Sequence, residues 1–385
     1  MHYFQQRYIK ENQPFPGLTG LYTVDLPNKG LLSGIEFKVW GTNGDDEDAP
    51  DVWLHDRLKK IEVMVNGSQV VKSLDGRQVI AMMCYKKTPV ISSDMKNLNG
   101  AACDESFYIN LGRHYHDLEY MLDLGQVSDP ELRIEFDFTL ADCSGYHCGE
   151  PMTVIPKINI ILHMLRDTSL VPKGYIKTSE IHRVDNAASL GYNLTVPRGP
   201  TYSNLYLQSW WYQFGLGSIL DHIEVNINSD DLIPYRMTPG ELANQNLRMY
   251  GLIDSIIYQF HVTGGQAYPF PLEQGYYEGR MVQGIDGLVA GGDLWGGFNV
   301  GQYTVISTNL AGAGTIHTYM NFKGIWPFSV APIPLFNPWD PDTWVDTSKL
   351  GDFWVRIEEN AGAKEGVMKL LGDEVVTRYT TPSWP

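Results

Sequence analysis

The sequence predicts an all-β protein built from two similar domains in tandem. Short segments that alternate apolar and polar residues with a period of two recur along the chain, and this is the pattern of half-buried strands. Only two segments read as convincing helices. The same series of segments occurs twice in the same order, which indicates an internal repeat. The 38 Gly and 22 Pro residues also fit a protein rich in turns.

Six segments carry the strand pattern most clearly: 35–39, 61–65, 132–138, 158–160, 223–227 and 353–357. Each has the length of an ordinary strand and is bounded by Gly, Pro, Asn or Asp. Short strands separated by turns indicate β-sandwiches or barrels, because a parallel α/β sheet would need helices between its strands.

Two helices are expected, over residues 75–85 and 238–250. Thr238 with Glu241 forms a capping box, and Pro239 falls at the first helical position, where its missing N–H costs nothing. Asp75 and Gln78, at the corresponding places, give the first helix a weaker form of the same capping signal. Both helices follow a strand, a turn and a short apolar pair, so they occupy equivalent places in the two halves.

Two further blocks match between the halves. Residues 26–40 align with 196–210 at an offset of 170, and residues 123–135 align with 346–358 at an offset of 223. Five of the thirteen positions in the second pair are identical, whereas average residue usage gives roughly one by chance. We interpret the series as the duplication of one domain; the alternative is that any two β segments look alike.

The offsets also predict the domain organisation. We expect an N-terminal arm over 1–18, a first domain over 19–166, a linker over 167–189 and a second domain over 190–385. The second half is longer, so it carries an insertion near residues 264–340. Between residues 294 and 339 the only formal charge is Lys323, while nine aromatic residues recur. Such a stretch is expected to fold on itself and to pack against another chain.

Charge and cysteine usage limit the partners and the compartment. The chain carries 29 Lys and Arg against 45 Asp and Glu, a net charge of −16, which disfavours broad binding to a phosphate backbone. The most apolar run, 153–165, is too short to span a bilayer, and the N-terminus lacks the apolar core of a signal peptide. Four Cys residues do not make a disulfide scaffold, so we expect a soluble protein made in a reducing compartment.

Three groups of residues could carry chemistry, and a structural interpretation is preferred for each. The acidic run from Asp45 to Asp51 could bind a cation, but it lacks the spacing of a calcium loop and reads as a solvated loop. Cys143, His147 and Cys148 lack the second pair of Cys or His ligands that zinc sites usually have. Whether Cys143 and Cys148 form a disulfide is open.

The third group is the motif 112–117, which contains His114, His116 and Asp117. No nucleophile motif accompanies it, so a structural or intersubunit role is expected. The sequence contains no phosphate-binding loop, nucleophile elbow or HExxH motif. We therefore predict no catalytic, cofactor-binding or metal-binding residue, although carboxylates paired from distant parts of the chain, as in sandwich hydrolases, stay open.

The repeated blocks resemble a known family. The matching motifs are Leu26-Pro27 to Gly30, residues 61–67 followed by 70–74, residues 107–113 with Asp117, Leu122-Asp123, and residues 344–348. In these motifs and in their order the chain is similar to the double jelly-roll major capsid proteins of tailless icosahedral viruses, which include membrane-containing phages and turreted archaeal viruses. The likeness covers most of residues 20–380, whereas the long insertion after Gly264 departs from the simplest members.

The resemblance implies two tandem eight-stranded jelly-roll β-sandwiches with short flanking helices, and a structural protein rather than an enzyme, without cofactors. Homotrimers would form pseudo-hexameric tiles of an icosahedral shell. The partners would be neighbouring capsomers, penton or other minor capsid proteins, and an internal lipid membrane as a candidate, with no sequence-specific nucleic-acid binding. The protein would lie in the virion, as in a bacteriophage, and assemble in the host cytoplasm. The arm, with Tyr3, Arg7 and Lys10, is expected to contact lipid or a neighbouring subunit.

Two other functions stay open from the sequence. A double-sandwich hydrolase acting on glycans or glycoproteins would need a cleft with acidic groups and aromatic platforms, for which Trp210 and Trp211 are available. A carbohydrate-binding protein without catalysis is the other alternative. If the insertion is an interface, Trp326 and Trp339 should matter for assembly more than for folding.

Overall fold

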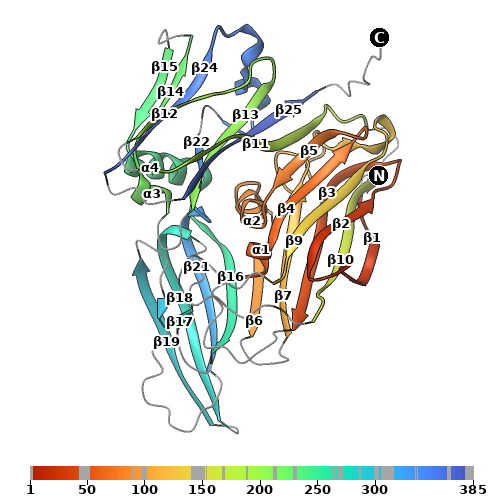
Figure 1. The fold of residues 1–385 in the computed structure, drawn as a ribbon, viewed down its shortest axis with the longest axis vertical. Coiled ribbons are helices and arrows are strands. Elements are labelled where there is room, and N and C mark those ends of the chain that lie inside the picture. Colours follow the sequence, from red (N-terminus) through yellow and green to blue (C-terminus); the bar gives the residue numbers. More distant parts are fainter. Residues whose placement is uncertain are drawn as a thin grey trace.

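The chain forms two β-sandwiches and a long β-hairpin region (Figure 1). The computed structural model describes residues 3–42, 53–88, 91–96, 102–139, 152, 154–166, 170–187, 190–210, 215–228, 232–262, 266–267, 272–285, 288–298, 303–304, 316–333, 335, 337–361 and 366–377. Among these residues, no helix is long and apolar enough to cross a membrane.

Eight strands form the first sandwich: β1 (Tyr3–Pro14), β2 (Thr19–Asp25), β3 (Leu31–Thr42), β4 (Leu58–Val65), β5 (Gln69–Leu74), β7 (Ala102–Asn110), β9 (Glu131–Asp137) and β10 (Lys157–Arg166). One sheet has the order β1-β10-β3-β7 and the other has the order β2-β9-β4-β5. Counted along the chain, the eight strands therefore lie in the orders 1-8-3-6 and 2-7-4-5.

Eight strands also form the second sandwich: β11 (Tyr175–Asp185), β12 (Gly191–Thr195), β13 (Thr201–Trp210), β14 (Leu220–Ile227), β15 (Leu232–Met237), β22 (Val330–Ile333), β24 (Phe353–Glu359) and β25 (Val367–Val376). Their sheets have the orders β11-β25-β13-β22 and β12-β24-β14-β15, which are again 1-8-3-6 and 2-7-4-5. The predicted all-β fold of two tandem eight-stranded sandwiches is confirmed, and the two copies share one topology.

Short helices flank the sandwiches at equivalent places. The two longest are α2 (Gly76–Tyr85) and α4 (Pro239–Tyr250), and each begins with the predicted capping box. The short ones are α1 (Leu54–Arg57), α3 (Leu216–Ile219), η1 (Leu124–Gln126), η2 (Pro341–Thr343) and η3 (Thr347–Lys349). Two-residue strands, β8 (Leu122–Asp123) and β23 (Val345–Asp346), precede η1 and η3 and pair with β3 and β13.

The turns repeat as closely as the strands. Asn66 and Asn228 follow β4 and β14, and both have a positive φ, of 53° and 57°, which asparagine tolerates better than most residues. The side-chain oxygen of Asn66 accepts a hydrogen bond from the Ser128 N–H (2.8 Å), and that of Asn228 accepts one from the Gly351 N–H (2.6 Å). Each asparagine thus ties its turn to the loop before the seventh strand of its own sandwich.

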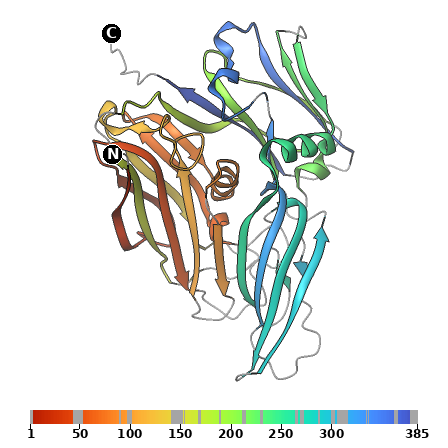
Figure 2. The same cartoon turned by 180° about the vertical axis from the view of Figure 1, so that it is seen from behind.

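The insertion in the second half forms an extension of the first sandwich. Its strands are β16 (Ile253–Val262), β17 (Gln266–Ala267), β18 (Leu272–Ile285), β19 (Leu288–Phe298), β20 (Tyr303–Thr304) and β21 (Ile316–Pro327). β16 pairs in parallel with β6 (Ile91–Lys96) of the first half, and the sheet continues in the order β6-β16-β21-β18-β19. Figure 2 shows this long-stranded region reaching from the second sandwich to lie beside β6.

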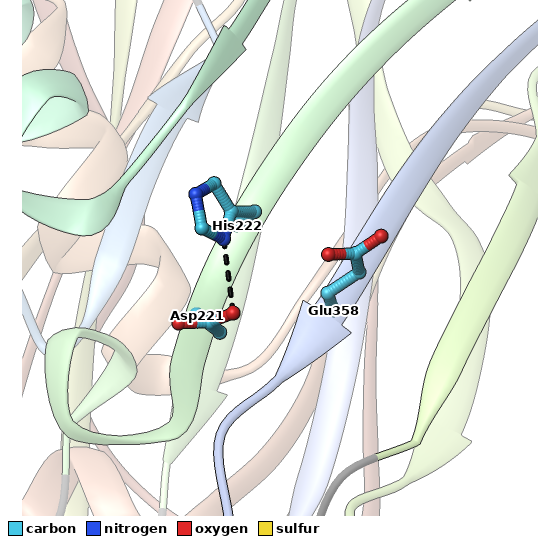
Figure 3. A group of neighbouring side chains, drawn as sticks. All are labelled: Asp221, His222 and Glu358. Atoms are coloured by element: carbon cyan, nitrogen blue, oxygen red, sulfur yellow. Dashed lines mark hydrogen bonds and ion pairs between the residues drawn. The ribbon is translucent and has the colours of Figure 1, made fainter.

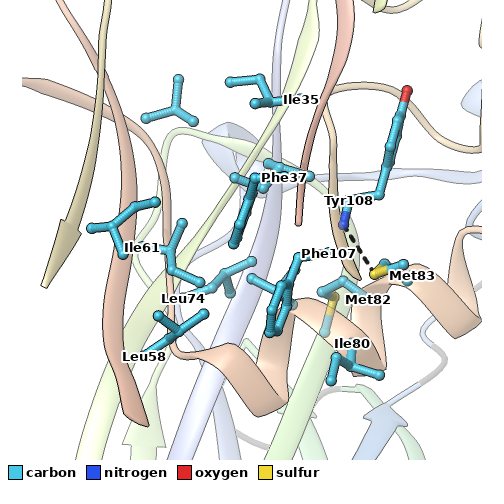
Figure 4. Packing of buried hydrophobic residues seen from close by; sticks show 14 of the residues in the cluster. Ile35, Phe37, Leu58, Ile61, Leu74, Ile80, Met82, Met83, Phe107 and Tyr108 are labelled. Carbon is cyan, nitrogen blue, oxygen red and sulfur yellow. Dashed lines mark hydrogen bonds between the residues drawn. The ribbon is translucent and has the colours of Figure 1, made fainter. Parts of the chain in front are cut away.

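Two large hydrophobic cores fill the sandwiches. In the first core Phe37 of β3 and Phe107 of β7 stack at 4.9 Å between ring centroids, while Ile80 and Met82 of α2 pack nearby (Figure 4). Burying a side chain of this size contributes about 1.5–3 kcal/mol. In β9 and β24 buried residues alternate with more exposed ones, which is the alternation that identified these two strands in the sequence.

Two predicted boundaries need correction. Residues 3–14, predicted as part of an arm, form β1 and pair along β10 as the first strand of the first sandwich. Residues 175–185, predicted as part of the linker, form β11 and pair along β25. Most of β1 is exposed or half-buried and β11 is largely polar, so neither strand shows the apolar alternation on which the boundaries were based.

Candidate functional site

The junction between the two sandwiches contains a group of buried polar and charged side chains in mutual contact. The sheet β2-β9-β4-β5 of the first sandwich continues into β11-β25-β13-β22 of the second, through one parallel bridge between Lys72 of β5 and Thr178 of β11. The second connection is the parallel pair β6–β16. Strand pairing therefore fixes the two copies side by side.

A buried charge cluster lies at this bridge. The Asp373 carboxylate of β25 accepts hydrogen bonds from the hydroxyls of Thr178 (2.5 Å) and Tyr206 (2.9 Å), and Lys86 Nζ lies 3.0 Å from it. Lys72 Nζ donates to the Thr178 hydroxyl at 2.6 Å. Lys72, Thr178 and Asp373 are at most 3% exposed. Two ammonium groups of the first sandwich thus share one carboxylate of the second.

Burial affects the members of the cluster differently. Burial alone would raise the pKa of Asp373, but the ammonium groups of Lys86 and Lys72 and its hydrogen bonds hold it below its usual range. Burial, together with the positive charge of Lys86, lowers the pKa of Lys72 well below its usual range, against the opposing effect of Asp373. The carboxylate is therefore stabilised as the ion, whereas the Lys72 ammonium is destabilised.

Helix α2 adds neutral and charged contacts across the junction. Gln78 Nε2 donates to Gln208 Oε1 of β13 at 2.7 Å, with both side chains buried. Asp75, the N-cap of α2, pairs with Lys369 of β25 at 2.8 Å between Oδ2 and Nζ. These contacts orient the second sandwich on the first.

A small cavity opens beside the charge cluster, lined by Lys86, Arg113, Tyr206, Trp339 and Asp373 among others. Its interior has room for about one water molecule. A sugar ring or a peptide would not fit in this cavity.

The predicted motif 112–117 lies next to this cavity. Arg113 Nε donates to Asp117 Oδ2 at 2.7 Å, and the Arg113 backbone N–H donates to the same oxygen at 3.0 Å. A further guanidinium nitrogen donates to Glu119 at 2.8 Å, and another reaches the carbonyl oxygen of Trp339 in the second half at 3.4 Å. Burial would raise the pKa of Asp117, but its bonds to Arg113 and to backbone N–H groups lower it. The motif forms an ion-paired loop.

Of the two histidines in this motif, His116 contacts β1 and β10, whereas His114 Nδ1 lies 3.1 Å from the backbone oxygen of Tyr115. The ring of Phe4 in β1 stacks on His116 at 3.9 Å between centroids, and His116 Nε2 lies 3.1 Å from His163 Nδ1 of β10. Burial and the neighbouring His163 lower the pKa of His116 to about 4. His116 is therefore neutral at physiological pH and packs as an aromatic ring.

One further group offers metal-ligand atoms. Asp221 and His222 at the start of β14 lie near Glu358 of β24, on the surface of the second sandwich (Figure 3). One ligand atom from each residue lies within 4.8 Å of the others. The sequence did not single out these residues, because Glu358 is distant in the chain from the other two.

Several sequence predictions fall elsewhere. The run from Asp45 to Asp51, the residues Cys143, His147 and Cys148, and Trp211 lie outside the described residues.

The expectation that Trp326 lies at an interface with another chain is corrected. Trp326 is 0% exposed in the second core, and its indole N–H donates to Asn246 of α4 at 2.7 Å.

The charge cluster itself was missed. Lys72 lies in a strand beside Val70 and Val71, and Asp373 follows the apolar Leu370-Leu371-Gly372 of β25. A charged residue inside an apolar strand is the signal that could have identified each of them. The sequence gives no signal that pairs them, because they are about 300 positions apart.

Comparisons with known proteins agree with this architecture. No protein-family model and no curated protein matches the chain. Among solved structures, the chain is similar to the STIV MCP of Sulfolobus Turreted Icosahedral Virus, with a TM-score of 0.59, 9% identity and 98% of each chain covered. It is also similar to the structure of PBCV-1 VP54 fitted into a reconstruction of the virophage Sputnik, with a TM-score of 0.54, 8% identity, and coverage of 97% of this chain and 94% of that one.

A third similar structure is the major capsid protein P2 from Bacteriophage PM2, with a TM-score of 0.50, 11% identity and 97% of each chain covered. The likeness runs through both sandwiches and the insertion, since nearly the whole of each chain is matched. Together with the repeated strand orders 1-8-3-6 and 2-7-4-5, it shows that the chain has the double jelly-roll fold of these viral major capsid proteins.

Proposed function

We propose that this protein is a major capsid protein, a structural and non-enzymatic subunit that builds the shell of an icosahedral virion. The observation that carries the proposal is the end-to-end match to viral capsid proteins, which covers 98% of both chains for the STIV MCP. A shared fold alone does not establish function. The junction adds support, because its buried contacts hold the two sandwiches in one unit.

We further propose that three copies close into a ring of six sandwiches. Within the chain, the fifth strand of the first sandwich (β5) meets the first strand of the second (β11). The fifth strand of the second sandwich (β15) and the first strand of the first sandwich (β1) have no such partner within the described residues. Each is the last strand of its sheet there. If β15 of one copy meets β1 of the next as β5 meets β11, the contact is head-to-tail, and contacts of this kind form a ring when their rotation closes. We propose that it closes after three chains.

The side chains on these two edges suit a contact between copies. Leu232 and Ile233 of β15 are 52% and 45% exposed, and Tyr3 and Tyr8 of β1 are 56% and 53% exposed. Apolar and aromatic groups are enriched in the buried centre of protein interfaces. An uncovered edge strand with such side chains would also promote aggregation, so covering it has a second benefit.

Trimers of this kind would tile a shell by contacting neighbouring capsomers, with other capsid proteins at the vertices. Solution mass tests the proposal. The purified protein should run as a trimer of about 130 kDa, three times 43.4 kDa, with a hexagonal outline in negative stain. A monomer at micromolar concentration would contradict the capsid role, and release of glycans by the purified protein would favour the hydrolase instead.

A substitution tests the edge contact separately. Ile233→Lys places a charge on the proposed interface, so the variant should fold normally but run as a monomer. Leu190→Lys is the matched control, because Leu190 is 48% exposed, much like Ile233, and directly precedes β12, at the opposite end of the β12-β24-β14-β15 sheet from β15. Trimers of Ile233→Lys as stable as the wild type would refute the β15–β1 contact while leaving the capsid role intact.

A further inference from the structure

We propose that Asp221, His222 and Glu358 form a binding site for a divalent transition-metal ion of the Zn²⁺ class on the surface of the second sandwich (Figure 3). The site would link β14 and β24, the fourth and seventh strands of this sandwich. It does not depend on the capsid role, since all three ligands come from one chain.

A β-bulge brings the first two ligands together. In the antiparallel pair β14–β24, Leu220 lies opposite Glu359 and His222 lies opposite Glu358, so Asp221 is an extra residue without a partner of its own in the register. Successive side chains of a regular strand point to opposite faces. The bulge removes this alternation, and Asp221 Oδ2 lies 2.9 Å from His222 Nδ1.

The strand register supplies the third ligand. Glu358 is directly opposite His222, and directly opposed residues of antiparallel strands have their Cβ atoms roughly 5 Å apart. Zinc bonds of roughly 2 Å to nitrogen and oxygen require somewhat closer ligand atoms than the observed 4.8 Å limit. The side chains of Asp221, His222 and Glu358 are 55%, 34% and 27% exposed, so they can rotate to close this distance.

Two arginines orient the glutamate. Arg356 lies 3.0 Å from Glu358 Oε1, and Arg236 lies 3.3 Å from Glu358 Oε2. Each carboxylate oxygen accepts two hydrogen bonds, so both guanidinium groups can stay in place while a metal ion binds the remaining lone pairs. Carboxylate ligands of metal sites are commonly held in this way by a second layer of hydrogen bonds.

The ligand set selects the class of ion. Asp221 and Glu358 together offer four carboxylate oxygens, whereas Ca²⁺ needs six to eight oxygen ligands. An imidazole with two carboxylates instead suits Zn²⁺ and neighbouring transition metals, with one coordination position open to water. The imidazole nitrogen would therefore determine which class of ion binds.

Metal titration of tag-free, full-length protein tests the site. After treatment with a chelator, Co²⁺ should bind with a visible ligand-field spectrum, Zn²⁺ should displace it, and Zn²⁺ should raise the melting temperature. The chain has ten His and four Cys residues, so the decisive quantity is the difference between variants. His222→Ala should weaken binding at this site at least 10-fold, and Asp221→Asn should weaken it less.

His182→Ala is the matched control, because His182 lies in β11 of the same sandwich and bonds a backbone oxygen rather than a carboxylate. It should bind the metal as the wild type does. The proposal is overturned if wild type and His222→Ala titrate identically, or if Ca²⁺ binds as tightly as Zn²⁺ and is unaffected by His222→Ala. Circular dichroism of each variant establishes that a loss of binding is not a loss of fold.

Discussion

At the scale of single residues, the junction depends on unequal lysines. Asp373 can neutralise one buried ammonium group, and Lys86 lies in direct contact with it, whereas Lys72 reaches it only through the Thr178 hydroxyl. A buried charge that is paired is tolerated, while an excess buried charge is costly. The pKa of Lys72 is accordingly lowered by burial and by Lys86, which indicates that the Lys72 ammonium, and not the Lys86 ammonium, is the destabilised charge of the cluster.

Replacing either lysine with methionine, which has a similar shape but no charge, should therefore change the free energy of unfolding differently. Lys86→Met leaves Asp373 without its direct partner and should lower the free energy of unfolding by about 3 kcal/mol. Lys72→Met removes the destabilised ammonium and should leave stability unchanged or higher. Urea denaturation at neutral pH measures both. Equal losses in the two variants would show that the cluster does not distinguish the two lysines.

At the scale of elements, the duplicated helices differ in what their caps do. Thr238 serves only as the N-cap of α4: its hydroxyl oxygen accepts a hydrogen bond from the Glu241 N–H at 3.4 Å. Asp75 caps α2 by accepting the Gln78 N–H at 2.8 Å, and its other oxygen pairs with Lys369 of the second sandwich. The same local motif is therefore only a helix start in one copy, whereas in the other it is also part of the junction.

Cap substitutions should separate these roles. Thr238→Ala should cost about 1 kcal/mol, and Asp75→Ala should cost up to about 2 kcal/mol because the partly exposed ion pair is lost as well. Asp75→Asn is the control, since asparagine caps as well as aspartate but carries no charge, so its cost should fall below that of Asp75→Ala. Thermal and urea unfolding provide the comparison. If Asp75→Ala costs no more than Thr238→Ala, the Lys369 pair adds nothing.

At the scale of the whole molecule, ionised carboxylates connect the halves. Asp373 joins the sandwiches directly, and Asp117 holds Arg113 against the Trp339 carbonyl of the second half. The folded-state pKa of each carboxyl lies below its usual value, since bonds to cationic and N–H groups outweigh burial. Such groups contribute stability above the unfolded pKa, and this contribution is lost as the pH falls through the folded pKa.

Acid should therefore loosen the attachment of the two halves. The contribution of these carboxylates to the free energy of unfolding should be complete above about pH 5 and should fall as the pH drops below about 4. Urea denaturation across this range measures the change. Asp373→Asn should be less stable at pH 7 and should show a shallower fall in acid. A wild-type acid slope that persists unchanged in Asp373→Asn would assign it to other groups.

Features that depend on residues close together in the chain could be predicted from the sequence. The capping boxes at Asp75 and Thr238, the strands with an apolar face and the repeated blocks are local, so they could be recognised in a single chain and gave the two-sandwich architecture. Duplication strengthened these signals because each appeared twice in the same order.

The tertiary structure alone decided which distant residues meet. β1 and β11 are strands because their backbone groups form hydrogen bonds with the neighbouring strands β10 and β25. Their side chains do not alternate between apolar and polar. Trp326 lies in a core rather than on a surface. Lys72 and Lys86 both interact with Asp373, although no sequence pattern connects these distant positions. Pairing across hundreds of positions is set by strand register and burial, and a local pattern of residues does not encode either.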